Sequence, residues 1–447
     1  MQSLIAGRKS GGLKASDPLI EFVQNALEED CGSDHDDGGR KTGTVAYGHS
    51  LREIFRRIEP LTHPSRCSEM RELIPGVGRF HASLPLVDAL QEYDSYTRLT
   101  QRRFVPPTFR EIRHILNVAA IEATVRGEDS VRLVTLDADE TIYSDGGTVS
   151  HDSPMIPLIS RLLTSGVRVS LVTAAGYSDA SRYEQRLGGL LRAFELAIEL
   201  GADPCFLDRF FVMGGEANYF LVTELDGRRR GDGTKASDCK SSSEAAGTSK
   251  STGAGETEGR TASEVQTAGR NEYPVAGPFS QLRVRFRMVP PEEWKDGRGV
   301  RWPHEKVGDL LDKAEACLVE TATRLGLDVR VIRKERAVGI VRADESEGSR
   351  LPYEVLEEIS LATQHALRGH EVPHCVFNGG ADAFVDVGHK ALGIRAVQAY
   401  AEAAPRSTLH FGDRFTRTGN DRKARAVASG VWVADPSETE LFLKLLI

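Results

Sequence analysis

The sequence predicts an α/β protein with a doubly wound, mostly parallel sheet, an inserted α+β cap and a helical N-terminal region. The main observation is that short apolar runs end in polar residues at 133–147, 167–177 and 408–413. Such runs are typical of buried parallel strands, whose carboxyl ends face the ligand crevice of an open α/β sheet. Helical apolar spacing between strands is the second observation, and a helix-rich stretch over 1–130 is the third.

Composition limits the classes of function. The 447 residues carry a net charge of −8, which argues against a nucleic-acid partner. The six cysteines are far apart and form no CxxC pair, so neither a zinc site nor a disulfide framework is expected. No signal segment or membrane-spanning run is visible, and we expect a cytoplasmic protein without a membrane partner.

The N-terminal region, 1–130, is expected to be helical, with apolar helical spacing at 17–27 and 109–117. His114 lies in the second of these segments. A single histidine in a helix is more often a satisfied core or surface residue than a ligand, so both interpretations remain open at this point.

The first apolar run delivers two carboxylates, Asp137 and Asp139, to a loop that ends in glycine. One carboxylate can attack phosphorus to form an acyl phosphate, and a second can transfer the proton of the leaving oxygen. Paired acids also require a cation, and oxygen ligands near a phosphate favour Mg²⁺. With Thr141 the pattern is D-x-D-x-T, which resembles the haloacid-dehalogenase-like phosphatases and phosphotransferases.

The second apolar run ends in Thr173, a hydroxyl followed by small residues where backbone donors can approach a phosphate. This matches the second motif of the same superfamily. On the helix that follows, Arg182 or Arg186 could face the anion, although solvent-exposed helix arginines are the more common case.

The middle of the chain has the character of a cap. Residues 131–215 and 376–447 are assigned to the catalytic core, and residues 216–375 to the cap. Within the cap, a stretch at about 227–269 is rich in Gly, Ser, Thr and charged residues and is expected to be disordered.

The last motifs complete the predicted site. Lys390 follows an apolar run at 383–387 and can hold the nucleophile and the phosphoryl oxygens together. Asp413 follows the strand-like run at 408–412 and is predicted to bind the metal with Asp137 and Asp139; Asp421 is predicted to support it directly or through water. An ordered series of acid pair, threonine, lysine and terminal acid is far more specific than any one member.

Longer strings narrow the resemblance to the IMP-specific 5′-nucleotidase family. They lie at 73–78, 113–117, 135–147, 172–177, 212–216, 333–339 and 377–380. The resemblance implies Mg²⁺-dependent hydrolysis of inosine 5′-monophosphate (IMP) through an aspartyl phosphate, activation by ATP, and a homo-oligomer expected to be a tetramer.

The same resemblance implies roles for individual residues. Asp145 would contact the substrate, as would Arg186, while Thr173 and Lys390 would bind its phosphate. His114 becomes a candidate for the ATP effector site. Two alternatives remain: a related phosphatase for sugar phosphates or many nucleotides, and a nucleotide-sensing scaffold that no longer turns over.

Overall fold

The computed structural model describes residues 16–32, 47–127, 129–226, 282–294, 302–343 and 351–447. The chain divides into two compact units, Met1–Glu224 with Val284–Ile447, and Leu225–Arg283. The predicted disordered insert at about 227–269 lies outside the described residues. All of the predicted site residues belong to the first unit.

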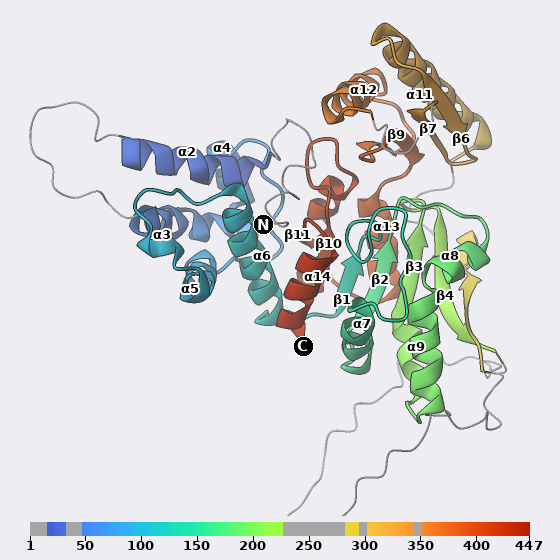
Figure 1. Cartoon of the computed structure of the whole chain (residues 1–447), viewed down its shortest axis with the longest axis horizontal. Helices are drawn as coiled ribbons and strands as arrows, with labels where there is room; N and C mark the ends of the chain where they lie inside the picture. Colours follow the sequence, from blue (N-terminus) through green and yellow to red (C-terminus); the bar gives the residue numbers. More distant parts are fainter. Residues whose placement is uncertain (1–15, 33–46, 128, 227–281, 295–301, 344–350) are drawn as a thin grey trace, which may run out of the picture. The chain divides into compact units, whose positions relative to one another are not determined.

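A seven-stranded sheet forms the centre of the first unit, in the order β11-β10-β1-β2-β3-β4-β5 (Figure 1). The bounds are β1 Leu133–Leu136, β2 Arg168–Val172, β3 Phe210–Gly214, β4 Tyr219–Leu225, β5 Val284–Met288, β10 Thr408–Gly412 and β11 Ser429–Trp432. The pairs from β11 to β3 are all parallel, and β4 is antiparallel to β3. The predicted mostly parallel sheet is therefore confirmed.

Helices cover both faces of this sheet, as a doubly wound fold requires (Figure 1). On one face lies α13 (Lys390–Tyr400), whose Ala391, Ile394 and Val397 share a buried cluster with strand residues such as Leu133. Helices α7 (Met155–Thr164) and α9 (Gly188–Glu199) pack together on the other face. Between β2 and β3 the single predicted helix is two helices, α8 (Ala180–Arg186) and α9.

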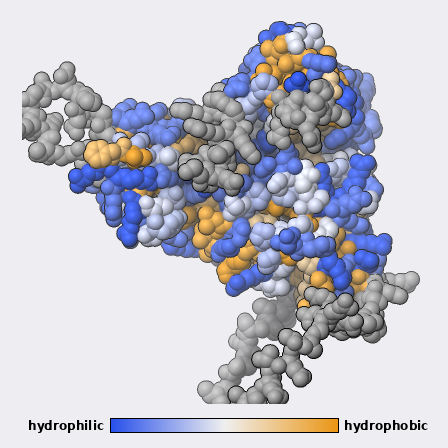
Figure 2. Space-filling view, viewed as in Figure 1, coloured by the Kyte–Doolittle hydropathy of each residue, from blue (hydrophilic) through white to orange (hydrophobic). Residues whose placement is uncertain are grey.

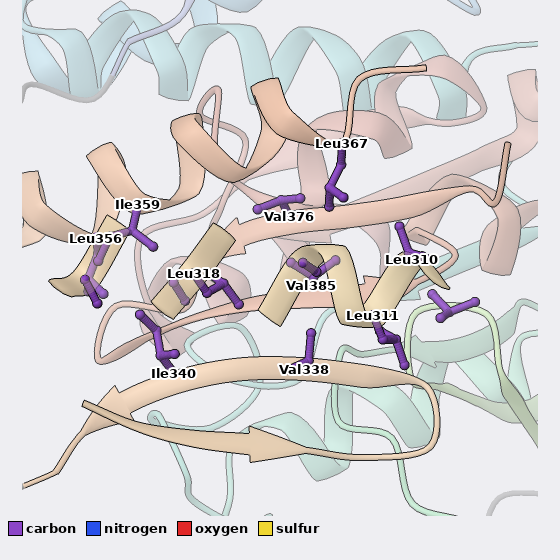
Figure 3. Close-up of a cluster of buried hydrophobic side chains, with 14 of the residues drawn as sticks. Leu310, Leu311, Leu318, Val338, Ile340, Leu356, Ile359, Leu367, Val376 and Val385 are labelled. Atoms are coloured by element: carbon purple, nitrogen blue, oxygen red, sulfur yellow. The ribbon is translucent and has the colours of Figure 1, made fainter. Parts of the chain in front are cut away.

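A second sheet has four antiparallel strands in the order β6-β7-β9-β8, namely β6 Val329–Arg333, β7 Ala337–Arg342, β9 Asp382–Val387 and β8 His374–Asn378. Helices α11 (His304–Arg324) and α12 (Tyr353–Ala366) pack on it. Leu310, Leu318, Val338, Ile359 and Val385 contribute to the hydrophobic core between helices and strands (Figure 3). This is the α+β unit that the sequence predicts between the second motif and Lys390.

The predicted cap boundaries, 216 and 375, do not coincide with the division of the strands between the two sheets. Strands β4 and β5 were assigned to the cap but extend the seven-stranded sheet, while β8 and β9 extend the four-stranded sheet across the predicted boundary. Apolar patterning identifies a strand, but hydrogen bonds to distant strands decide to which sheet it belongs.

The N-terminal region is helical, as predicted, with α2 (Pro18–Gly32), α3 (Tyr47–Ile58), α4 (Cys67–Leu73), α5 (Leu86–Thr97) and α6 (Phe109–Val125). Helix α6 begins with a capping box, in which Thr108 and Glu111 exchange hydrogen bonds between side chain and backbone. It packs against β11, and ten of its side chains are buried.

Among the described residues, no helix is both long and apolar enough to cross a membrane. Hydrophilic residues cover most of the face shown in Figure 2, and hydrophobic residues appear there as separate patches. Large exposed hydrophobic side chains include Tyr96, Phe104 and Leu200.

Candidate functional site

The predicted catalytic side chains follow the carboxyl ends of three neighbouring parallel strands. Asp137 comes directly after β1, Thr173 after β2 and Asp413 after β10. Because β1 pairs in parallel with both β2 and β10, these three residues meet at one edge of the sheet. This is the convergence that the sequence predicts for a doubly wound fold.

Asp137 is buried and held from both its backbone and its side chain. Its N–H donates to the carbonyl of Phe411 at 2.8 Å, and its Oδ1 accepts from the N–H of Ala138 at 2.7 Å. Its other carboxylate oxygen contacts the ammonium group of Lys390. The carboxylate therefore has a fixed orientation.

Lys390 is completely buried, and its Nζ lies between Asp137 and Asp421, 2.5 Å from Asp421 Oδ1. The assignment of 376–447 to the catalytic core implies that the apolar run before Lys390 is a strand of the core sheet. That interpretation is wrong: the run is β9 of the four-stranded sheet, and Lys390 is the first residue of α13. The helix, which packs against the core sheet, brings Lys390 to the site.

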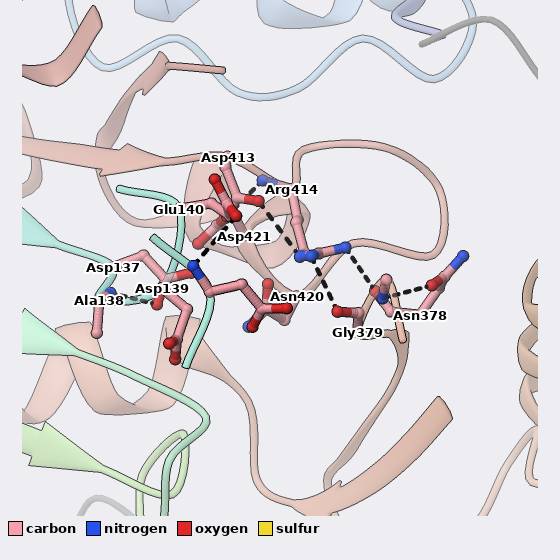
Figure 4. A network of polar contacts seen from close by, with 12 residues as sticks. Asp137, Ala138, Asp139, Glu140, Asn378, Gly379, Asp413, Arg414, Asn420 and Asp421 are labelled. Atoms are coloured by element: carbon pink, nitrogen blue, oxygen red, sulfur yellow. Dashed lines mark hydrogen bonds and ion pairs between the residues drawn. The ribbon is translucent and has the colours of Figure 1, made fainter. Parts of the chain in front are cut away.

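Asp137, Asp413 and Asp421 form an acidic cluster, each offering a carboxylate oxygen within 4.8 Å of the others. Asp413 Oδ1 is buried and has no hydrogen-bond donor among the described residues. Carboxylate oxygens are the protein ligands that Mg²⁺ prefers, so this unsatisfied oxygen fits a bound cation. The acidic cluster (Figure 4) therefore suits the predicted metal.

The two remaining predicted metal residues differ from Asp413. Asp421 accepts from Lys390 and His410 at Oδ1 and from the N–H of Arg414 at Oδ2, so most of its acceptor capacity is already used. This suits the supporting role that the sequence suggests. The carboxylate of Asp139 is not part of the acidic cluster, and its role as a metal ligand stays a prediction.

The electrostatics of the acidic cluster reflect a shortage of positive charge. Burial raises the pKa of Asp137 well above its usual range, with Asp421 and Asp413 acting in the same direction and Lys390 opposing them. Burial also raises the pKa of Asp413 to about 7, against the charge of Arg414. Although burial disfavours its charge, the neighbouring Asp137 and Asp421 raise the pKa of Lys390, which therefore stays protonated. A divalent cation would stabilise the ionised carboxylates.

Asp139 is more open to solvent, with a side chain that is 38% exposed. Its Oδ1 accepts from the N–H of Gly146 at 2.9 Å and lies 3.9 Å from Arg186 Nη1. The same guanidinium donates to the carbonyl of Gly147 at 2.7 Å. The structure thus brings Arg186 next to the Asp139 loop, and its contact with the substrate stays a prediction.

The remaining predicted residues of the site lie on two loops: Thr173 follows β2, and Thr141 and Asp145 lie on the loop after β1. Thr173 is buried, and its Oγ1 accepts from the N–H of Ala175 at 3.1 Å. Asp145 is exposed, and its N–H donates to Glu140 Oε1 at 3.1 Å. Thr141 is buried, and its Oγ1 has no hydrogen-bond partner among the described residues. The substrate contacts assigned to Thr173 and Asp145 stay predictions.

His114 is a buried helix residue with a structural partner. Its Nε2 lies 2.9 Å from Glu438 Oε1, and Arg113 Nη2 donates to the other oxygen of Glu438 at 2.6 Å. Glu438 belongs to α14 (Pro436–Leu443), so these contacts join α6 to the C-terminal helix. The satisfied-histidine interpretation describes this arrangement, and the effector role of His114 stays a prediction.

Three residues at the site were missed by the sequence reasoning. Arg414, directly after Asp413, donates from Nη1 to the carbonyl of Asn378 at 3.0 Å and from Nη2 to that of Gly379 at 2.9 Å (Figure 4). His410 is a buried polar residue between the apolar Leu409 and Phe411 of β10, which is a signal the sequence does contain. Buried Glu216 has a left-handed backbone, with φ of 64°, and accepts from Asn420 Nδ2 at 3.2 Å; no local pattern identifies it.

Comparisons with known proteins identify one family over most of the chain. A model of the family described as IMP-specific 5′-nucleotidase matches residues 46–230 and 277–443. IMP-specific 5′-nucleotidase 1 of Yarrowia lipolytica is 33% identical over 454 residues, which cover 96% of this chain and 94% of that protein. The protein of the same name from Saccharomyces cerevisiae is 33% identical over 404 residues, with 85% and 78% covered.

Solved structures are similar over most of the chain. The N-terminally truncated, IMP-bound IMP-nucleotidase of Plasmodium falciparum has a TM-score of 0.69 and 28% identity, covering 96% of this chain and 94% of that one. The ATP-bound form of that nucleotidase has a TM-score of 0.68 and 28% identity, covering 99% and 86%.

Proposed function

Because this chain belongs to the IMP-specific 5′-nucleotidase family, a family of phosphoric monoester hydrolases, we propose that it hydrolyses IMP to inosine and phosphate. The single observation that carries the proposal is the buried, oriented carboxylate of Asp137 beside the ammonium of Lys390. A nucleophile needs a fixed direction of attack, and the phosphoryl group needs a nearby cation. The names of the relatives support IMP as the substrate.

The first proposed step transfers the phosphoryl group to the protein. An oxygen of Asp137 attacks phosphorus, and the bond from phosphorus to O5′ of the nucleotide breaks. Asp139 donates a proton to the departing O5′, so inosine leaves as a neutral alcohol. The partial exposure of Asp139 suits a group that must exchange protons with solvent and substrate.

The second proposed step releases phosphate. Asp139, now ionised, takes a proton from a water molecule while the oxygen of that water attacks the phosphorus of the aspartyl phosphate. The bond from phosphorus to the Asp137 oxygen breaks, which returns the carboxylate and frees inorganic phosphate. Lys390 stabilises the negative charge of the phosphoryl oxygens through both steps.

Asp137 and Asp413 would hold a magnesium ion, with Asp421 supporting them. Asp413 Oδ1, buried and without a donor among the described residues, is the observation that favours this assignment. When bound, Mg²⁺ supplies positive charge next to the transferring phosphoryl group.

A panel of phosphomonoesters tests the substrate. Purified protein is given IMP, other purine and pyrimidine 5′-monophosphates and several sugar phosphates with Mg²⁺, and released phosphate is measured. We expect IMP to have the highest kcat/KM. A preference for a sugar phosphate, or equal rates with all nucleotides, would favour the related-phosphatase alternative; nucleotide binding without phosphate release would favour the sensing scaffold.

We also propose that ATP activates the enzyme, a proposal supported by the ATP-bound relative. A cavity that is partly open to solvent is a candidate effector site. Its lining includes Arg79 and His81, the ion pair of Arg425 with Asp17, and Leu116 of α6. His114 does not line this cavity.

Two variants distinguish the possible effector positions. If the cavity binds ATP, Arg79→Ala abolishes activation and keeps turnover without ATP, and His114→Ala keeps the activation. The opposite result would favour the predicted role of His114. Homo-oligomerisation, expected as a tetramer, stays a prediction that the solution mass of the purified protein tests.

A further inference from the structure

A buried chain of hydrogen bonds lies behind the acidic cluster, and none of the roles above uses it. Thr135 and His410 are register partners on β1 and β10, and both are completely buried. Thr135 Oγ1 lies 2.9 Å from His410 Nδ1, and His410 Nε2 lies 2.9 Å from Asp421 Oδ1. The same Asp421 oxygen accepts from Lys390 Nζ at 2.5 Å. The chain therefore ends at the ammonium that pairs with Asp137.

The partners fix the direction of these hydrogen bonds. An ionised carboxylate can only accept, so His410 Nε2 carries a proton and donates it to Asp421. His410 Nδ1 then accepts from the hydroxyl of Thr135, which lies closer to this nitrogen than to the carbonyl of Leu409, at 3.2 Å. Asp421 thus fixes the imidazole tautomer, and the hydroxyl of Thr135 satisfies the Nδ1 atom that this tautomer leaves as an acceptor.

Asp421 is held from three sides, because the N–H of Arg414 donates to its second oxygen at 2.9 Å. Without His410, one of the two donors to Asp421 Oδ1 would be lost, and the carboxylate could rotate. Lys390 would then lose the fixed acceptor that lies opposite Asp137. Partners that orient the groups of a site in this way influence its chemistry without touching the substrate.

We propose that His410 is a positioning residue, which acts through Asp421 to hold the Lys390 ammonium against Asp137, and that Thr135 orients the imidazole of His410 by donating to its Nδ1. This inference rests on the proposed hydrolysis of IMP. It assigns a function to a buried polar pair that lies between apolar neighbours on β1 and β10.

Five variants test it: His410→Leu, His410→Gln, Thr135→Val, Thr135→Ser and the control Ser170→Ala. Leucine removes the donor to Asp421, whereas the glutamine amide can donate to Asp421 and accept from Thr135. Valine has the shape of threonine without its hydroxyl. Ser170 is the register partner of Thr135 on β2 and is equally buried. Within the part of the chain that the structure describes, its hydroxyl donates to the neighbouring carbonyl of Leu171, at 3.2 Å.

The measurements are kcat and KM for IMP at saturating Mg²⁺, per folded enzyme, together with the melting temperature. We expect kcat to fall by about 10- to 100-fold in His410→Leu and by about tenfold in Thr135→Val. KM should stay within about threefold, because the loss affects charge stabilisation in the transition state. His410→Gln and Thr135→Ser should recover most of kcat, and Ser170→Ala should match wild type.

A lower melting temperature with wild-type kcat in both His410→Leu and Thr135→Val would overturn the inference, since the chain would then be only structural. An equal loss of kcat in Ser170→Ala would overturn it too. Thr135→Val keeps the test decisive if His410→Leu does not fold. Wild-type protein that releases no phosphate from IMP would overturn the proposed function itself and this inference with it.

Discussion

The ammonium group of Lys390 forms an ion pair with the carboxylate of Asp137, and both side chains are buried. The two residues are 253 positions apart in the sequence (390 − 137). Their contact joins the end of β1 to the start of α13. The first two predictions follow from this pair.

Asp137→Asn should abolish turnover while leaving the fold intact. A neutral amide cannot act as the nucleophile, and we expect phosphate release from IMP to fall by at least about 10³-fold. The control is Asp152→Asn, an exposed aspartate, which should behave as wild type. Nearly normal turnover in a pure Asp137→Asn preparation would contradict the proposed mechanism.

Lys390→Met should destabilise the protein as well as inactivate it. It leaves Asp137 and Asp421 buried without their shared cation, which costs about 3–5 kcal/mol when one partner of a buried pair is removed. The exposed pair of Lys306 and Glu371 provides a comparison, since Lys306→Met should cost at most about 1 kcal/mol. Denaturant unfolding measures both. The double variant Lys390→Met with Asp137→Asn should be more stable than Lys390→Met, because it buries one charge fewer.

Removing the carboxylate of Asp413 should weaken metal binding. Asp413→Asn is expected to raise the Mg²⁺ concentration at half-maximal activity by about 10- to 100-fold. Adding EDTA to wild type should stop phosphate release, and excess Mg²⁺ should restore it. An unchanged Mg²⁺ requirement in Asp413→Asn, with normal melting, would show that this oxygen does not bind the metal.

The ionised carboxylate of Glu438 should stabilise the folded protein, and this stabilisation should be lost at acidic pH. Burial acts to raise its pKa, but the hydrogen bond with His114 and the charge of Arg113 lower the pKa from the ordinary 4.5 to about 2. The folded state therefore holds the ionised form more strongly than the unfolded state does. Its contribution, about 3 kcal/mol, is fully present above pH 4.5 and is lost as the pH falls towards 2. Glu438→Gln should be less stable at pH 7 and should lose less stability between pH 4.5 and the lowest pH reached.

Glu216 should have the opposite effect on stability. Burial raises its pKa from the ordinary 4.5 to about 7, against the charge of Lys390. The folded state keeps the proton after the unfolded state has lost it. The protein should therefore lose stability as the pH rises from 4.5 to 7 through this group. Glu216→Gln keeps a neutral side chain of similar shape and should remove this loss, which unfolding curves across that range measure.

The residues at the carboxyl ends of the core strands could be predicted from the sequence, because buried parallel strands have a recognisable local pattern. Runs of apolar residues that end in acid or threonine are typical of buried parallel strands, and the carboxyl ends of such strands share one edge. Asp137, Thr173 and Asp413 were found in this way. His410 was missed because a polar residue inside an apolar run weakens the strand pattern without showing what it contacts.

Local sequence patterns are enough to predict the α/β class, the helical N-terminal region and the residues that carry the predicted chemistry. They do not show that β9 belongs to the four-stranded sheet, that Lys390 enters the site from a helix, or that His410 donates to Asp421; these facts come from the folded structure. The physical reason is that strand periodicity is a local property of the backbone, whereas sheet membership and buried ion pairs depend on which distant segments meet. Burial makes those contacts specific, because an unpaired charge or hydrogen-bond donor inside the core raises the free energy of the folded state.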